Sequence, residues 1–130
     1  MEHYDFDKDH KLNLNNERDL QQAVVKYLRV TDLLFTATLG DMLDTPSSRI
    51  RSYLRGYKKG ICDVIIFSPC SGYNGFCLEL KAPGYGSGIL SKEQRNFLHT
   101  MAVENNYFCL CSNNYTEILE CIIKYTHNIL

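Results

Sequence analysis

Two carboxylates and an amine stand at the ends of two strand-like runs of the sequence. Asp63 opens an apolar run, and Glu79 and Lys81 close the next run in the order Glu-Leu-Lys. A hairpin folded about Ser71 would bring Asp63 roughly opposite that tripeptide, and strand alternation would place Glu79 and Lys81 on one face. The two acids could then share a hard cation with the Leu80 carbonyl between them, and such an ion activates water against a phosphate. The same groups also fit a structural ion pair, so the spacing leaves both interpretations open.

Two further polar residues fall on inward-facing helix positions. Glu17 lies on the same helical stripe as Val24, although an acid in a first turn also favours the helix dipole. Gln94 lies on the same helix face as Leu98, and with Ser91 it also forms the pattern of a capping box. For both residues, a role in the site and a purely helical role are both consistent with the sequence.

A basic segment lies between positions 49 and 59. It has five cations and no acid, namely Arg49, Arg51, Arg55, Lys58 and Lys59. Such a patch can bind phosphates although the formal net charge of the chain is -1. A solvated helix face explains the segment equally well. Tyr85 and Lys92, in and after a glycine-rich stretch at 84–88, fit either substrate contact or solvent exposure.

The composition is that of one folded domain. The chain has 130 residues, of which 45% are hydrophobic and 22% charged, and it shows no internal repeat. We expect a single domain over 1–130, with a polar, acidic leader at 1–12 that is loosely ordered. No signal peptide or apolar stretch of membrane-spanning length is visible, so no membrane is expected.

The cysteines and histidines do not form a metal or disulfide pattern. Five of the six cysteines lie inside apolar runs and there is no CxxC pair, which favours reduced structural thiols. This predicts an intracellular, reducing compartment, either a bacterial or host-cell cytoplasm or a nucleus. The four histidines show no ligand spacing, no serine or cysteine has an evident base partner, and no small-molecule cofactor is expected.

Hydrophobic periodicity and turn residues predict an α/β domain with elements in the order α-β-α-β-β-α-β-α. Helices are expected from an N-cap at Asn15 or Asn16 to about position 29, and at 45–55, 91–104 and 114–125. Strands are expected at 33–39, 62–68, 76–81 and 107–111. The helix between the last two strands implies a parallel pair within a mixed four-stranded sheet flanked by helices.

Four stretches, taken in order, resemble the VRR-NUC family of the PD-(D/E)XK nuclease superfamily. They are NNERDLQQAVVKYLR, KKGICDV, GFCLELKAPG and LSKEQRNFL. The resemblance implies a restriction-endonuclease-like core in which Glu17, Asp63 and Glu79 bind Mg²⁺ or Mn²⁺. It also implies that Lys81 positions or activates the attacking water and that Gln94 supports the site.

One departure from the family pattern is visible. Cys62 stands where a proline usually precedes the aspartate, which puts the sub-family in question more than the activity.

The resemblance therefore implies a metal-dependent DNA endonuclease. Stand-alone members of the family, of viral or phage type, act on branched DNA such as Holliday junctions in DNA repair and form homodimers. Here Asp63, Glu79 and the Leu80 carbonyl would hold the first ion, and Glu17 would complete the site or hold a second. The basic segment, with Lys92, would bind the DNA backbone. Two alternatives are a sequence-reading restriction-type nuclease and a non-catalytic DNA-binding module on the same fold.

Overall fold

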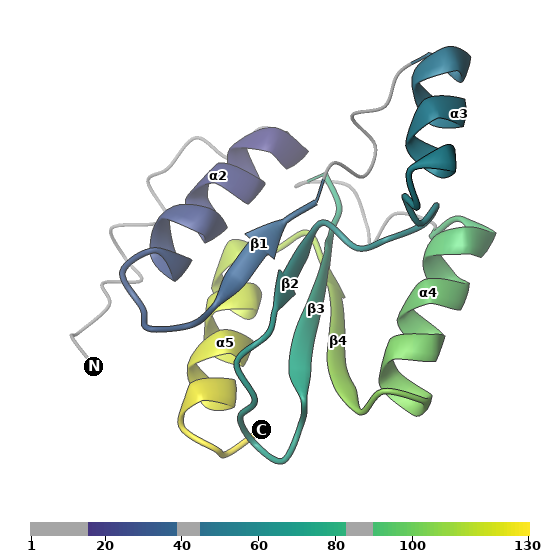
Figure 1. The fold of residues 1–130 in the computed structure, drawn as a ribbon. Coiled ribbons are helices and arrows are strands. Elements are labelled where there is room, and N and C mark those ends of the chain that lie inside the picture. The colour runs from purple at the N-terminus through teal and green to yellow at the C-terminus, as the bar shows by residue number, and fades with distance from the viewer. Residues whose placement is uncertain (1–15, 39–44, 83–89) are drawn as a thin grey trace.

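The computed structural model describes residues 16–38, 45–82 and 90–130. In this part of the chain, helices flank one four-stranded sheet, and the elements follow the predicted order (Figure 1). The elements are α2 (Glu17–Leu28), β1 (Phe35–Ala37), α3 (Pro46–Leu54), β2 (Val64–Ile66), β3 (Gly75–Leu80), α4 (Lys92–Val103), β4 (Tyr107–Ser112) and α5 (Tyr115–Thr126). The predicted leader at 1–12 and the glycine-rich stretch at 84–88 lie outside the described residues.

The sheet is mixed, with strand order β1-β2-β3-β4. The pairs β1/β2 and β2/β3 are antiparallel, and β3 and β4 are parallel because α4 returns the chain to the same end of the sheet. The predicted α/β fold class, with its mixed four-stranded sheet and one parallel pair, is confirmed.

Each of the four described helices begins at a side-chain N-cap. The side chains of Asn16, Thr45, Ser91 and Asn114 each accept a hydrogen bond from the backbone N–H three residues later. Such a side chain satisfies one of the backbone donors that a helix start leaves without a partner. Because this hydrogen bond joins residues only three positions apart, the starts of the helices can be predicted from the sequence.

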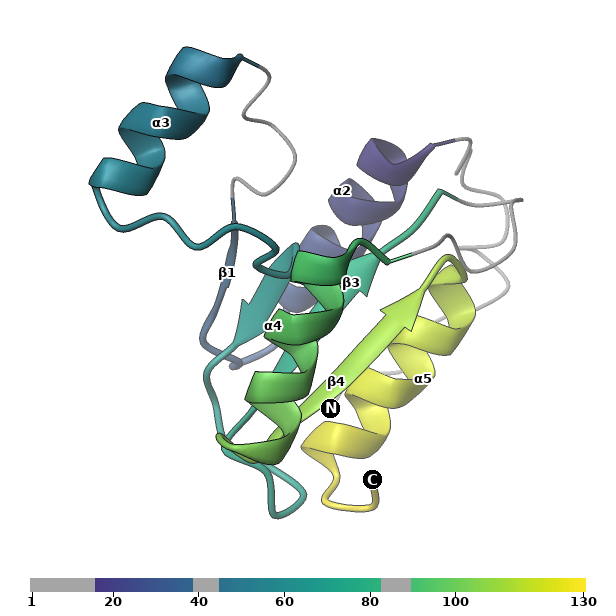
Figure 2. The same cartoon turned by 90° about the vertical axis from the view of Figure 1, so that its right-hand side faces the viewer.

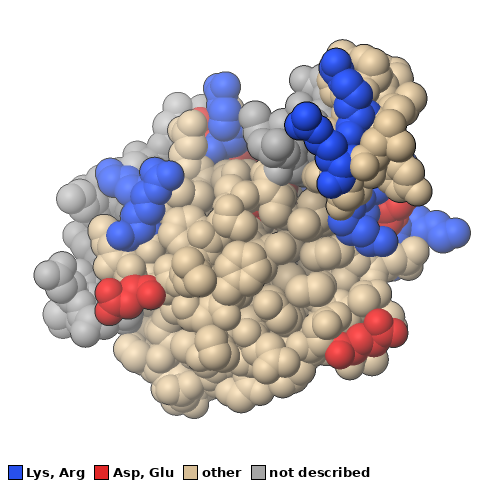
Figure 3. All heavy atoms as spheres, in the orientation of Figure 1, with Lys and Arg blue, Asp and Glu red and all other residues tan. Residues whose placement is uncertain are grey.

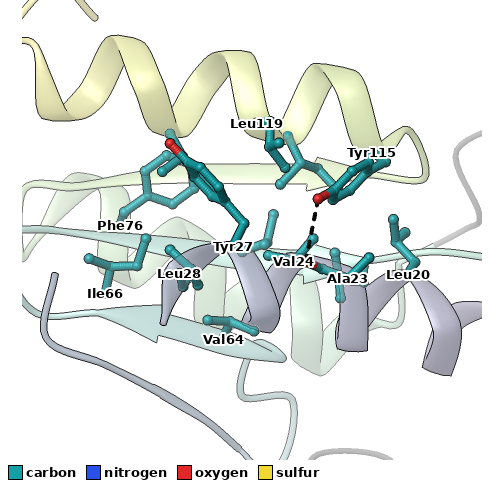
Figure 4. Close-up of a cluster of buried hydrophobic side chains, with 14 of the residues drawn as sticks. Leu20, Ala23, Val24, Tyr27, Leu28, Val64, Ile66, Phe76, Tyr115 and Leu119 are labelled. Carbon is teal, nitrogen blue, oxygen red and sulfur yellow. Dashed lines mark hydrogen bonds between the residues drawn. The ribbon is translucent and has the colours of Figure 1, made fainter. Parts of the chain in front are cut away.

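Helices cover both faces of the sheet. Helices α2 and α5 pack on one face, where the main cluster of apolar side chains lies (Figure 4). In that cluster the Tyr115 hydroxyl donates to the Ala23 carbonyl at 3.5 Å. Helix α4 covers the other face (Figure 2). There Leu98 of α4 and Cys77 of β3 belong to a second cluster of buried side chains. Alternation along β3 therefore directs Glu79, two residues after Cys77, to the side of α4.

The hairpin between β2 and β3 turns at Ser71 and Gly72, which have φ angles of 55° and 78°. Positive φ at both central residues is typical of the tight turns whose twist matches the flanking strands. The register pairs Val64 with Leu78, so Asp63, one residue earlier, lies opposite Glu79. The predicted fold about Ser71 is confirmed.

Two strands are shorter than predicted. The run at 33–39 forms a strand only over Phe35–Ala37, and the run at 62–68 only over Val64–Ile66. An apolar run in the sequence indicates burial, whereas a strand also requires continuous hydrogen-bonded pairing with a neighbouring strand. Cys62 and Asp63 are buried but precede the paired part of β2. Position 39 lies outside the described residues.

Helix α3 stands apart from the rest of the domain, at the end of the sheet near the start of α4 (Figures 1 and 2). None of its residues is buried. Among the described residues, no helix has the length and hydropathy needed to cross a bilayer.

Candidate active site

Asp63 is held by backbone contacts on both sides. It is 7% exposed, and its Oδ2 accepts a hydrogen bond from the Leu80 backbone N–H at 2.7 Å. Its own carbonyl accepts a hydrogen bond from the Thr38 N–H at 2.9 Å. A charge-assisted bond to a buried carboxylate is strong, so this contact fixes the Asp63 side chain against the end of β3.

Glu79 lies next to Asp63 and contacts two other predicted site residues. It is 1% exposed, and its Oε1 accepts a hydrogen bond from Gln94 Nε2 at 2.9 Å. Lys81 Nζ lies 3.8 Å from the same Oε1 and donates to Gln94 Oε1 at 3.3 Å. Groups from the start of β2, the end of β3 and the first turn of α4 thus meet at one end of the sheet.

Gln94 takes both roles that the sequence left open. Its backbone N–H donates to Ser91 Oγ at 3.1 Å and its Oε1 accepts from the Ser91 N–H at 2.9 Å, which completes a capping box. The same Oε1 also accepts from Lys81, and the amide nitrogen reaches Glu79. The cap and the site therefore share one side chain in one conformation.

The two carboxylates form a donor set suited to a hard cation. Both are almost fully buried, and a buried charge is costly unless a partner or metal compensates it. Lys81, with 14% of its side chain exposed, forms an ion pair with Glu79. Carboxylate oxygens are among the ligands that Mg²⁺ and Mn²⁺ prefer. The ion pair of Lys81 with Glu79 is also present, so both interpretations of the sequence have a structural counterpart.

Glu17, the third predicted acid, lies at the N-terminal end of α2. It is the first residue of α2 and is half-buried, next to the Asn16 cap. Across 16–38, 45–82 and 90–130, no three His, Cys, Asp or Glu side chains are grouped to hold a metal ion. The predicted metal roles of Glu17 and of the Leu80 carbonyl therefore stay predictions.

The predicted DNA-binding residues lie on the surface. All five cations of the basic segment are exposed on α3 or in the loop that follows it, and Lys92 is exposed at the start of α4. Lys59 Nζ lies 3.4 Å from Glu93 Oε1, which connects the loop to α4. In Figure 3, blue side chains gather in the upper part of the molecule, including α3, whereas the broad face below is nearly uncharged.

Cys111 is a neighbour of the site that the sequence did not indicate. It is the register partner of Glu79 across the parallel pair of β3 and β4, so both side chains face α4. Burial raises the pKa of its thiol, the charge of Lys81 opposes this, and the nearby Glu79 carboxylate raises the pKa further. Its proximity depends on pairing between distant strands, and the alternation of β4 alone could not assign it to Glu79.

Comparison with known proteins supports the fold. No protein-family model and no curated protein matches the sequence. A solved structure described as "VRR_NUC domain protein" has a similar fold, with a TM-score of 0.68 and 18% sequence identity. The match covers 87% of this chain and 89% of that one. At this identity the likeness establishes the fold, and it agrees with the resemblance seen in the sequence.

Proposed function

We propose that this chain is a VRR-NUC-type nuclease that hydrolyses phosphodiester bonds in DNA with a divalent metal ion. The observation that carries the proposal is the meeting of Asp63, Glu79, Lys81 and Gln94 at one end of the sheet. Two buried carboxylates beside an amine are the groups needed to hold a cation and manage the proton of an attacking water. The similar fold of a VRR_NUC domain protein supports the same conclusion.

Asp63, Glu79 and the Leu80 carbonyl would hold Mg²⁺ or Mn²⁺, with Glu17 as a further ligand or part of a second site. When bound, the ion would supply positive charge that stabilises the developing charge on the phosphate. The protein's contribution is geometric: the Leu80 N–H holds the Asp63 carboxylate, and the Gln94 amide holds the Glu79 carboxylate. Both acids therefore need little reorganisation on binding the ion.

Lys81 would orient the attacking water as an ammonium group or, as the neutral amine, take its proton. Its Nζ lies near Glu79 Oε1 and donates to Gln94 Oε1, and 14% of the side chain is exposed, so Lys81 is close to Glu79 and reaches solvent. The basic segment and Lys92 would bind phosphates of the DNA backbone, which gives affinity without sequence preference. We further propose branched DNA as the substrate and a homodimer as the working unit.

Cleavage assays test this proposal directly. Purified protein should cut a four-way junction or a flap with Mg²⁺ or Mn²⁺ but not with EDTA. Asp63→Ala and Glu79→Ala should abolish cutting, whereas Glu120→Ala, which removes an exposed acid from α5, should not. Equal cutting by Glu79→Ala and the wild type would refute the proposal. Discrete bands from a linear plasmid would instead indicate a restriction-type enzyme.

A further inference from the structure

The apolar side of α3 faces solvent. Ile50, Tyr53 and Leu54 are spaced to share one helix face, and they are 61%, 73% and 77% exposed. Ser48 and Ser52, on the opposite side, are the two half-buried residues of the helix. A surface helix ordinarily turns its apolar stripe towards the core, so α3 has the reverse arrangement. An exposed apolar patch of this kind marks an interaction surface.

Positive charges border the apolar stripe on both sides. At about 100° per residue, Arg49 lies next to Tyr53 on one edge, and Arg51 lies beyond Leu54 on the other. The sequence from 45 to 60 contains no acid. A second copy of α3 would therefore be repelled by this surface, whereas a polyanion would be attracted to it.

The helix is attached next to the candidate active site. The loop after α3 leads directly into Asp63, and its Lys59 pairs with Glu93 of α4. Gly60 packs so closely on α4 that a Cβ there would lie 2.4 Å from the Glu93 carbonyl carbon and oxygen. Glu93 directly precedes Gln94, so the loop that follows α3 is anchored one residue from the site. Nucleic acid bound at the site would pass near α3.

We infer that α3 binds unpaired nucleotides of the DNA substrate, with a base stacked on Tyr53. Ile50 and Leu54 would extend the apolar surface under the base, and Arg49 and Arg51 would contact the neighbouring phosphates. Aromatic side chains interleaved with cations are a general means of holding single strands, because every base has an apolar face. In an intact duplex these faces are hidden by pairing and stacking, so the stripe adds affinity only where strands are open. The inference rests on the proposed function and specifies its substrate as DNA with unpaired nucleotides.

The test compares two DNAs in EDTA by fluorescence anisotropy. One is a fork with single-stranded arms and the other is a blunt duplex with the same number of base pairs. Tyr53→Ala should weaken binding to the fork about tenfold, the loss expected from one stacked base, and leave binding to the duplex unchanged. Tyr53→Phe should retain fork binding. Val103→Ala, at an equally exposed apolar position at the far end of α4, should have no effect on either DNA.

Each other outcome overturns the inference. Equal affinity losses for fork and duplex, or no loss for either, would show that Tyr53 does not read unpaired bases. A change of oligomeric state by Tyr53→Ala in sedimentation, with unchanged fork preference, would make the stripe a protein interface. Loss of binding to anionic vesicles without a change in DNA binding would make it a membrane-binding surface. Circular dichroism should show unchanged thermal unfolding, because Tyr53 is mostly exposed.

Different results would refute the nuclease assignment and the proposed binding of unpaired nucleotides by α3. If the fork preference depends on Tyr53 but no DNA is cut with Mg²⁺ or Mn²⁺, the nuclease assignment fails and the binding inference stands. If Asp63→Asn abolishes cutting but Tyr53→Ala leaves fork binding unchanged, the nuclease assignment stands and the binding inference fails.

Discussion

Replacing Gln94 with alanine removes three side-chain hydrogen bonds that serve two different structures. One bond, from the Ser91 N–H, belongs to the cap of α4. The other two join Gln94 to Glu79 and Lys81 in the candidate active site. Ser91→Ala is the matched control, because it removes the Ser91 Oγ half of the capping box and leaves the Gln94 amide in place. Comparing the two variants separates the cap from the site.

The expected destabilisation follows from the partners that are lost. The loss of a helix cap in Ser91→Ala should cost about 1 kcal/mol. Gln94→Ala loses one side of the cap and also the hydrogen bond to the Glu79 carboxylate, which is 1% exposed. Hydrogen bonds to charged groups contribute about 1.5–3 kcal/mol to stability. We therefore expect Gln94→Ala to cost about 2–4 kcal/mol in total. The excess over Ser91→Ala, about 1–3 kcal/mol, measures the contribution of the site contacts.

The loss of stability is measured by urea unfolding without divalent ions. The loss of activity is measured by single-turnover cleavage with Mg²⁺. Cleavage by Gln94→Ala should fall about 10–100-fold, the usual cost of removing a residue that orients a metal ligand, whereas Ser91→Ala should retain its rate. Equal destabilisation by both variants, together with unchanged cleavage by Gln94→Ala, would show that Gln94 is a cap and nothing more.

Three further predictions concern the metal, the loop before Asp63 and the pH dependence of folding. Mg²⁺ or Mn²⁺ should raise the melting temperature of the wild type but not of Glu79→Gln, because only the wild type should gain stability from binding the ion. Gly60→Ala should destabilise the domain by about 2 kcal/mol or more in urea unfolding, since its φ is 85° and its Cβ would clash with the Glu93 backbone. Gly56→Ala, with φ of 97° but open space around the Cβ, should cost less, and equal costs would contradict the packing argument. Burial raises the pKa of Tyr125 to about 12, so its contribution to stability is fully present below about pH 10 and is lost as the pH rises towards 12. Tyr125→Phe should remove that part of the alkaline pH dependence in urea unfolding.

Much of the site could be predicted because its main determinants are local. Alternation over three residues is enough to place Glu79 and Lys81 on one face, and their 3.8 Å separation agrees with it. The turn residues after Pro69 predict the hairpin, and the pairing of β2 with β3 places Asp63 opposite Glu79. Local patterns do not predict how far Glu17 lies from the other two acids. Its helical stripe predicts an inward direction, but its distance from Asp63 and Glu79 depends on how α2 docks on the sheet.

The sequence by itself determined the order of the elements, the starts of the helices and the faces of β3, because capping and alternation act over a few residues. Only the tertiary structure decided that Gln94 serves the cap and the site together, since that requires the start of α4 to pack against the end of β3. It likewise decided that Ile50, Tyr53 and Leu54 of α3 face solvent. Their spacing predicts an apolar stripe, but whether such a stripe is buried depends on contacts with distant parts of the chain, and α3 makes few of them.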